Sequence, residues 1–97
     1  MAHKIVWSEL ALESIDSIAE YISKDSPAYA SRVVDTIYTA TRRLIRFPDS
    51  GRLVPESRYR MYREVFAYNF RILYRVDGSN VVIVNVIHGS QDLPNLQ

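Results

Sequence analysis

Arginine and tyrosine dominate the centre of the chain, and arginine is well suited to holding a phosphate or a carboxylate. Nine of the ten arginines fall between Arg42 and Arg75, and residues 58–75 read RYRMYREVFAYNFRILYR. A guanidinium group is planar and offers parallel N–H donors to the oxygens of an anion. Lysine occurs only at Lys4 and Lys24. The run predicts a surface that recognises anionic groups; the alternative is that these arginines only decorate exposed strands.

The charge of the chain is segregated along the sequence. Residues 42–75 carry nine arginines against Asp49, Glu56 and Glu64, a net charge of +6. Residues 1–26 carry two lysines against five carboxylates, a net charge of −3, whereas the whole chain has a net charge of +1. A surface divided in this way can steer an oppositely charged partner.

Length and composition are typical of one small globular domain. The 97 residues are 47% hydrophobic and 24% charged, so we expect a single domain over residues 1–97. The chain has no cysteine, and its two histidines, His3 and His88, lie near opposite ends. We therefore expect no disulfide, no metal site and no cofactor. The apolar runs are too short to cross a membrane, and the N-terminal residues do not form a signal peptide, which favours a cytoplasmic protein.

Two helices are predicted to precede the strands that carry most of the arginines. Ser8 is suited to cap a helix that follows a short strand at residues 4–7, and isoleucines at helical spacing form an apolar stripe. Ser26 and Pro27 then form a second start signal, a capping residue followed by proline in the first turn. We expect a helical hairpin over residues 8–46, with a tight turn at residues 25–26.

Three strands are expected after the helical hairpin. Pro48, Gly51 and Pro55 predict irregular structure over residues 47–58. Segments rich in β-branched and aromatic residues then predict strands at 59–66, 70–76 and 81–88, joined by turns at 67–69 and 77–80. The order is β-α-α-β-β-β. It predicts an α+β fold with an antiparallel sheet, a meander of the last three strands, and the helices packed on one face. The tail from Gly89 is expected to be irregular.

Alternation along the strands divides the central side chains between the two faces of the sheet. Phe70, Ile72 and Tyr74 are expected to face the helices, and Arg71 and Arg75 to lie on the opposite, solvent-facing surface.

The strand before these residues leaves two arrangements open. Arg63 and Glu64 lie on opposite faces of that strand, and a one-residue change in the hairpin loop exchanges the faces. If Glu64 faces Arg71 or Arg75, we expect an internal salt bridge. If Arg63 does, the surface is a patch of three arginines.

Four segments, in this order, resemble the RelE/ParE toxin superfamily, and its ParE-like branch most closely. They are IVWSELALESIDSIAEYI, RLIRFPDSGRLVPE, YREVFAYNFRILYRV and VVIVNVIHGSQDL, and they span nearly the whole chain. Their order and spacing form a fairly specific signature. The resemblance implies the β-α-α-β-β-β fold and a small intracellular, growth-inhibiting toxin of a type II toxin–antitoxin system. Such a toxin is neutralised by a cognate antitoxin encoded beside it.

The two branches of the superfamily imply different targets. RelE-like members cut messenger RNA in the ribosomal A site, whereas ParE-like members are associated with inhibition of DNA gyrase and with plasmid stabilization. The resemblance therefore implies gyrase as the target, with the ribosome and its messenger RNA as the alternative. A third possibility is a member that binds its antitoxin but poisons nothing.

The resemblance also marks single residues. Arg71 matches the phosphate-binding arginine of the ribonuclease members, and His88 matches a position where several members carry histidine. In a nuclease, His88 and Glu64 would transfer protons while Arg71 stabilises the phosphate charge. However, Gly89-Ser90-Gln91 replaces the basic residue expected after His88, and the lysines of the preceding strand are absent. Whether the chain is an enzyme is left open.

The target-binding surface and the partners follow from the same resemblance. Target binding is assigned to Arg63, Arg71, Arg75, Tyr68 and His88. An antitoxin would wrap the apolar grooves with an amphipathic helix and a strand, and the helical hairpin and first strand would offer the apolar surface for it. A toxin–antitoxin hetero-oligomer is therefore implied.

Overall fold

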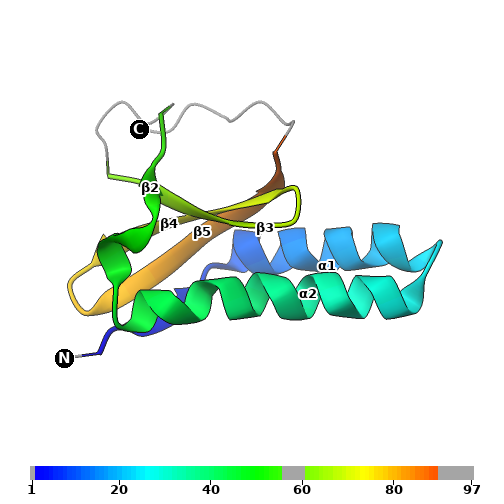
Figure 1. The fold of residues 1–97 in the computed structure, drawn as a ribbon, viewed down its shortest axis with the longest axis horizontal. Helices are drawn as coiled ribbons and strands as arrows, with labels where there is room; N and C mark the ends of the chain where they lie inside the picture. The colour runs from blue at the N-terminus through cyan, green and yellow to red at the C-terminus, as the bar shows by residue number, and fades with distance from the viewer. Residues whose placement is uncertain (1, 56–60, 90–97) are drawn as a thin grey trace.

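The computed structural model describes residues 2–55 and 61–89, and its elements follow the predicted order with additions. Strand β1 (Lys4–Trp7) leads into helices α1 (Glu9–Ser23) and α2 (Pro27–Thr41). Two short 3-10 helices come next, η1 (Arg42–Ile45) and η2 (Pro48–Ser50). The remaining strands are β2 (Arg52–Leu53), β3 (Arg63–Ala67), β4 (Phe70–Asp77) and β5 (Asn80–His88). The two long helices lie side by side along one face of the sheet (Figure 1).

The sheet is mixed. Its strand order is β1-β5-β4-β3-β2. The pairs β2–β3, β3–β4 and β4–β5 are antiparallel, and the pair β1–β5 is parallel. The predicted meander and the α+β class are confirmed. The parallel pair is the one departure from the antiparallel sheet expected from the sequence. It arises because the chain crosses the sheet through the helical hairpin before the meander begins.

Side-chain caps fix where the helices start, as the sequence predicts. The Ser8 hydroxyl accepts a hydrogen bond from the Ala11 N–H at 3.1 Å, and the Ser26 hydroxyl accepts one from the Tyr29 N–H at 3.1 Å. The second helix is shorter than the predicted limit of residue 46, since the chain tightens into η1 after Thr41. Within the described ranges, no helix is long and apolar enough to cross a bilayer.

The segment predicted to be irregular over residues 47–58 contains regular structure, which corrects that expectation. Arg52 and Leu53 form β2 by pairing with Glu64 and Arg63. Pro48 starts η2. A two-residue edge strand has no periodicity of its own, because pairing with a distant strand creates it. The predicted strand over 59–66 falls partly outside the described residues, and β3 begins only at Arg63. The predicted tail, residues 90–97, also lies outside them.

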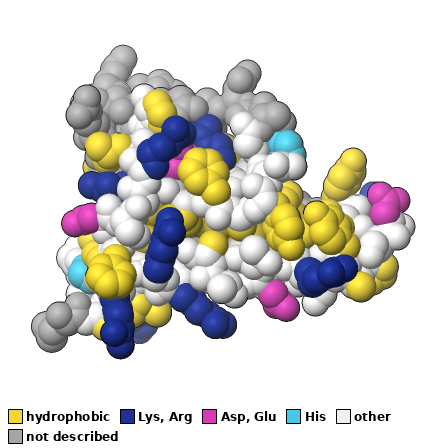
Figure 2. Space-filling model, viewed as in Figure 1, with side chains coloured by type: hydrophobic (Ala, Val, Ile, Leu, Met, Phe, Trp, Pro, Cys, Tyr) yellow, Lys and Arg dark blue, Asp and Glu magenta, His cyan; other side chains and the backbone are white. Residues whose placement is uncertain are grey.

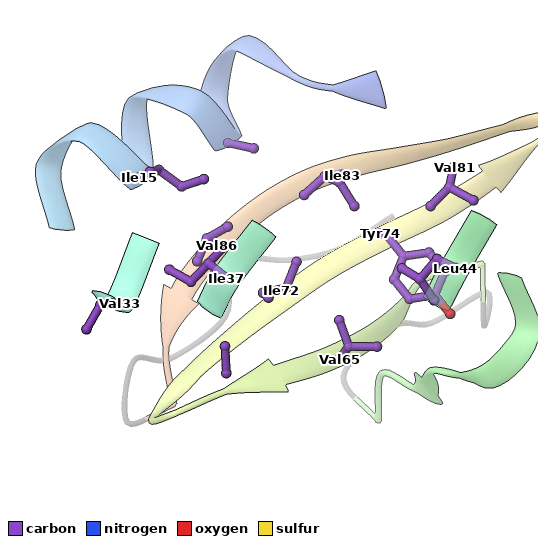
Figure 3. Close-up of a cluster of buried hydrophobic side chains, with 12 residues drawn as sticks. Ile15, Val33, Ile37, Leu44, Val65, Ile72, Tyr74, Val81, Ile83 and Val86 are labelled. Atoms are coloured by element: carbon purple, nitrogen blue, oxygen red, sulfur yellow. The ribbon is translucent and has the colours of Figure 1, made fainter. Parts of the chain in front are cut away.

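One core joins both helices to the inner face of the sheet. Ile15 from α1 and Ile37 from α2 belong to one buried cluster with Ile72 and Tyr74 of β4 (Figure 3). Ile37, Ile72 and Tyr74 are fully buried, which confirms that this face of β4 is turned toward the helices. The outer face of the sheet carries a second, smaller apolar cluster, formed by Val54, Leu73 and Ile87 with Tyr62 beside it.

Candidate functional site

The register between β3 and β4 decides which side chains accompany Arg71. Phe66 lies opposite Arg71, and Glu64 lies opposite Leu73, so Glu64 shares the outer face of the sheet with Arg71. Arg63 lies opposite Tyr74, on the face that carries the helices. The internal salt bridge is therefore the arrangement that forms, and the patch of three arginines does not.

Glu64 is held between two arginines from neighbouring strands. Its Oε1 accepts a hydrogen bond from Arg71 Nε at 2.6 Å, and its Oε2 accepts two from Arg52, from Nη2 at 2.6 Å and from Nε at 2.9 Å. We call Arg52, Glu64 and Arg71 the arginine–glutamate cluster. The Glu64 side chain is completely buried, so its charge depends on these two guanidinium groups.

Arg71 is buried, which corrects the expectation that it lies on a solvent-facing surface. Its side chain is 9% exposed, whereas that of Arg52 is 59% exposed. The Arg52 guanidinium lies over the ring of Phe66, with its central carbon 5.6 Å from the ring centroid. The accessible part of the arginine–glutamate cluster is thus Arg52 with an exposed aromatic ring. The buried Arg71 contributes its positive charge, which offsets the negative charge of Glu64.

Arg63 and Tyr74 fasten the loop before β2 to the inner side of the sheet. Arg63 Nη1 donates to the Gly51 carbonyl at 2.9 Å and to the Asp49 carbonyl at 3.1 Å. The Tyr74 hydroxyl accepts from the Gly51 N–H at 2.9 Å and donates to the Pro48 carbonyl at 2.6 Å. Burial raises the pKa of the Tyr74 hydroxyl above its ordinary value, and the hydrogen bond from Gly51 offsets part of that rise. Arg63 therefore stabilises the position of the loop at residues 49–51 relative to the sheet.

The other three proposed target-binding residues fall in two places, Arg75 near one end of β4, and Tyr68 and His88 together near the other. Arg75 lies near the β4–β5 turn, with Nη1 3.4 Å from Asp77 Oδ2. Tyr68 occupies the β3–β4 turn with φ of +53°, a left-handed conformation that bulky residues rarely adopt. Its ring stands edge-on to Tyr29 of α2, at 6.0 Å between centroids. His88 ends β5, edge-on to Phe70 at 5.6 Å. The five residues do not form one continuous surface.

The set proposed for a nuclease is divided by the sheet. Arg71 lies opposite Ile87, whereas Phe70 lies opposite His88. Since neighbouring residues of a strand point to opposite faces, His88 is on the helix side and Arg71 on the outer side. The structure brings Glu64 and Arg71 together but keeps His88 away from both. The described part of the chain also contains no group of three acidic or histidine side chains that could hold a metal ion.

A groove of about 780 Å³ runs between α1 and the ends of β4 and β5. Its wall is mainly apolar and aromatic, with Leu10, Tyr21, Tyr29, Tyr68 and Phe70 among the lining residues, and Glu13 and His88 also line it. Tyr21 is 76% exposed and Leu10 52% exposed. The sequence analysis did not single out this groove. Its signal was the large apolar side chains of α1 and α2 that lie outside the isoleucine stripe.

Comparisons with known proteins settle the family. The model of a family described as the ParE toxin of the type II toxin–antitoxin system parDE matches residues 5–93. The chain belongs to the ParE toxin family. It is thus a toxin of a type II toxin–antitoxin system within the RelE/ParE superfamily, as its sequence resemblance implied.

Two curated proteins are similar to this ParE-family chain over nearly their full lengths. A candidate toxin of Sinorhizobium fredii (strain NBRC 101917 / NGR234), Y4kP, is 37% identical over 95 residues, covering 96% of this chain and 95% of that protein. Toxin RelE2 of Caulobacter vibrioides is 30% identical over 88 residues, covering 91% of this chain and 97% of that protein. The family model carries the ParE name, whereas one of these two relatives carries the RelE name.

Two solved structures share the fold. The chromosomal ParDE system of P. aeruginosa superposes with a TM-score of 0.75 at 21% identity, over 90% of this chain and 96% of that one. The toxin–antitoxin complex RelBE2 of Mycobacterium tuberculosis gives 0.59 at 21% identity, over 91% of this chain and 99% of that one. At this identity the likeness concerns the fold alone.

Proposed function

We propose that this ParE-family toxin inhibits DNA gyrase and is held inactive by a cognate antitoxin. The match to the ParE family over residues 5–93 carries the proposal. The geometry supports it against a nuclease. Cleavage of RNA requires proton-transfer groups next to the residue that stabilises the phosphate. Here the sheet separates His88 from Arg71, and Glu64 is engaged by two arginines.

The second candidate is a ribosome-dependent messenger RNA endonuclease. The similarity to Toxin RelE2 at 30% identity favours it. It would have to work with a catalytic set other than Arg71, His88 and Glu64 acting together.

Purified gyrase and relaxed plasmid DNA separate the two candidates. We expect the full chain to block ATP-dependent supercoiling, and we expect cells that express it without an antitoxin to show a DNA-damage response with intact messenger RNA. Messages cut at A-site codons, together with unimpaired supercoiling, would overturn the gyrase proposal. The same chain premixed with the product of the neighbouring gene serves as the control, and inhibition should disappear.

The apolar groove beside α1 is the surface we assign to the antitoxin. It is open and rich in aromatic side chains, which suits the apolar face of an amphipathic helix. Glu13 is among its lining residues and α1 carries no basic residue in its last turn, so a helix with a cation beside its apolar face fits best. A soluble monomer rarely leaves such a patch uncovered.

Truncation of Tyr29 tests this assignment. We expect Tyr29→Ala to weaken binding of the neighbouring gene product at least tenfold, because about 1.4 kcal/mol of lost contact corresponds to one decade. Isothermal titration calorimetry measures the change. Phe47→Ala, which removes a ring that is 64% exposed and lies outside the groove, is the control for Tyr29, which is 43% exposed, and should leave the affinity unchanged. Equal losses for both variants would move the antitoxin site elsewhere.

A further inference from the structure

We propose that the η1 end of the molecule binds the phosphate backbone of a nucleic acid. The surface consists of Arg42, Arg43, Arg46 and Phe47, and we call it the η1 basic surface. All three arginines are exposed, and Phe47 is 64% exposed.

The arginines of η1 differ from those of the strands in what they contact. Arg52 and Arg71 bind Glu64, and Arg63 and Arg75 lie within salt-bridge distance of Asp49 and Asp77. Within residues 2–55 and 61–89, no carboxylate forms a salt bridge with Arg42, Arg43 or Arg46. These four strand arginines thus each lie beside a carboxylate of the described chain, whereas the charges of the η1 arginines are available to a partner.

Local geometry groups the charges on one surface. A 3-10 helix has three residues per turn, so Arg43 and Arg46 project from the same side, while Leu44 is buried beneath them. The Ile45 carbonyl accepts a hydrogen bond from the His3 N–H at 2.7 Å, which places exposed Lys4 at the start of β1 nearby. In Figure 2 more dark-blue side chains lie over the left part of the molecule than over the right part, where the helical hairpin turns.

Stabilisation of α2 does not account for this surface. Cations are favourable next to a helix C-terminus, but the effect fades within about one turn. Helix α2 ends at Thr41, and Arg46 lies beyond a further 3-10 turn. An exposed phenyl ring beside Arg46 has no part in helix capping either.

The composition of the surface points to nucleic acid as the anion. Guanidinium groups pair with phosphate oxygens through two N–H donors, and an aromatic ring next to them can stack on a base. Both candidate targets of the toxin, gyrase on DNA and the ribosome, contain a polyphosphate backbone. Phosphate binding by the η1 basic surface is therefore expected whichever of these two targets the toxin has.

Two double variants with the same change of net charge provide the test. Arg42→Gln/Arg46→Gln removes two charges from the η1 basic surface, and Lys24→Gln/Arg32→Gln removes two from the helical hairpin. Binding of the full chain to a fluorescent 20-base-pair DNA duplex, and to an RNA hairpin of equal charge, is followed by anisotropy at several salt concentrations. Far-UV circular dichroism confirms that all variants are folded.

We expect the η1 variant to lose at least tenfold in affinity at about 100 mM salt, and the hairpin variant less than twofold. The slope of log K against log salt should fall by about 2 in the η1 variant, because each lost phosphate contact removes about 0.9. Tighter binding of the duplex or of the hairpin identifies DNA or RNA as the source of the phosphates. Equal losses in both double variants, no binding by the wild-type chain, or equally tight binding of poly-glutamate would overturn the proposal. The assay needs no toxicity, so its failure is distinct from failure of the gyrase proposal.

Discussion

Glu64 determines what the central arginines can do. Its buried carboxylate joins Arg52 of β2 to Arg71 of β4, so a residue that the sequence marks as a phosphate ligand is mainly engaged in holding three strands together. The sequence could state the two possible arrangements but could not choose between them. A change of one residue in the β3–β4 turn would have put Arg63 in the place of Glu64.

Glu64→Gln should destabilise the protein by about 3–5 kcal/mol, because it removes the buried carboxylate that pairs with both Arg52 and Arg71. Urea unfolding followed by circular dichroism measures the loss. Asp77→Asn removes the acid beside Arg75 at an exposed pair and should cost less than about 1 kcal/mol. Similar losses of unfolding free energy in the two variants would show that the arginine–glutamate cluster contributes no more to stability than an exposed ion pair.

The raised pKa of the Tyr74 hydroxyl predicts how stability changes at alkaline pH. The folded state holds the phenol proton more tightly than the unfolded state, so this contribution is complete below about pH 10 and is lost as the pH rises through the folded pKa. Tyr74→Phe should cost about 1–3 kcal/mol at neutral pH, because the Gly51 N–H and the Pro48 carbonyl lose their partner. Its stability should then decline less steeply than that of the wild type above pH 10. Parallel declines in thermal-melting profiles from pH 8 to 11 would contradict the linkage.

At the scale of elements, the sequence predicts where the helices start but not which strands pair. Ser8 and Ser26 act locally, within three residues of the N–H groups they cap, so the sequence predicts both helix starts correctly. Strand β2 and the parallel pairing of β1 depend on partners far along the chain, and no local pattern encodes them. Burial of Arg71 was missed for the same reason, since its neighbours on the outer face depend on how β3, β4 and β5 pair.

Gly51 is the point at which the loop before β2 touches the sheet. A Cβ at this position would lie 2.6 Å from Tyr74 Cε1 and 2.8 Å from the Glu64 carbonyl oxygen. Because the second contact is with backbone, Gly51→Ala should displace β2 and destabilise the protein by at least about 1–3 kcal/mol, the usual cost of overpacking. Gly78→Ala is an informative comparison, since its turn is open and its penalty comes from positive φ alone. Chemical unfolding of both variants should show the larger shift at Gly51 and, by NMR, resonance changes across β2.

At the scale of the whole molecule, a single core under the sheet makes folding depend on both helices. The outer face has only a small apolar cluster, so the helical hairpin supplies most of the burial. Composition and periodicity predicted this arrangement well, because amphipathic helices of this length leave few other ways to cover a sheet. The distribution of partner surfaces could not be read in the same way, since the groove and the η1 basic surface each combine residues from separate elements.

Ile37→Ala tests the dependence on the helices. Ile37 is fully buried beneath the sheet, and we expect a loss of about 2–5 kcal/mol from the removed methyl groups and the cavity left behind. Leu12→Ala truncates a side chain that is 42% exposed on α1 and should cost much less. If the two variants unfold at the same urea concentration, α2 is not part of the core that holds the sheet.

The parallel pair of β1 and β5 sets an order on folding during synthesis. Lys4 pairs with Asn80, and Trp7 pairs with Ile83, so the first strand made must wait for the last described strand before it can join the sheet. Both helices and the β3–β4 hairpin emerge from the ribosome earlier, and the edge of the sheet closes only when β5 has left the exit tunnel. The sheet of the nascent chain therefore stays incomplete until β5 has been synthesised and released from the tunnel. The interval before β5 appears is therefore time in which a partner already present in the cell can reach the exposed face of the helical hairpin.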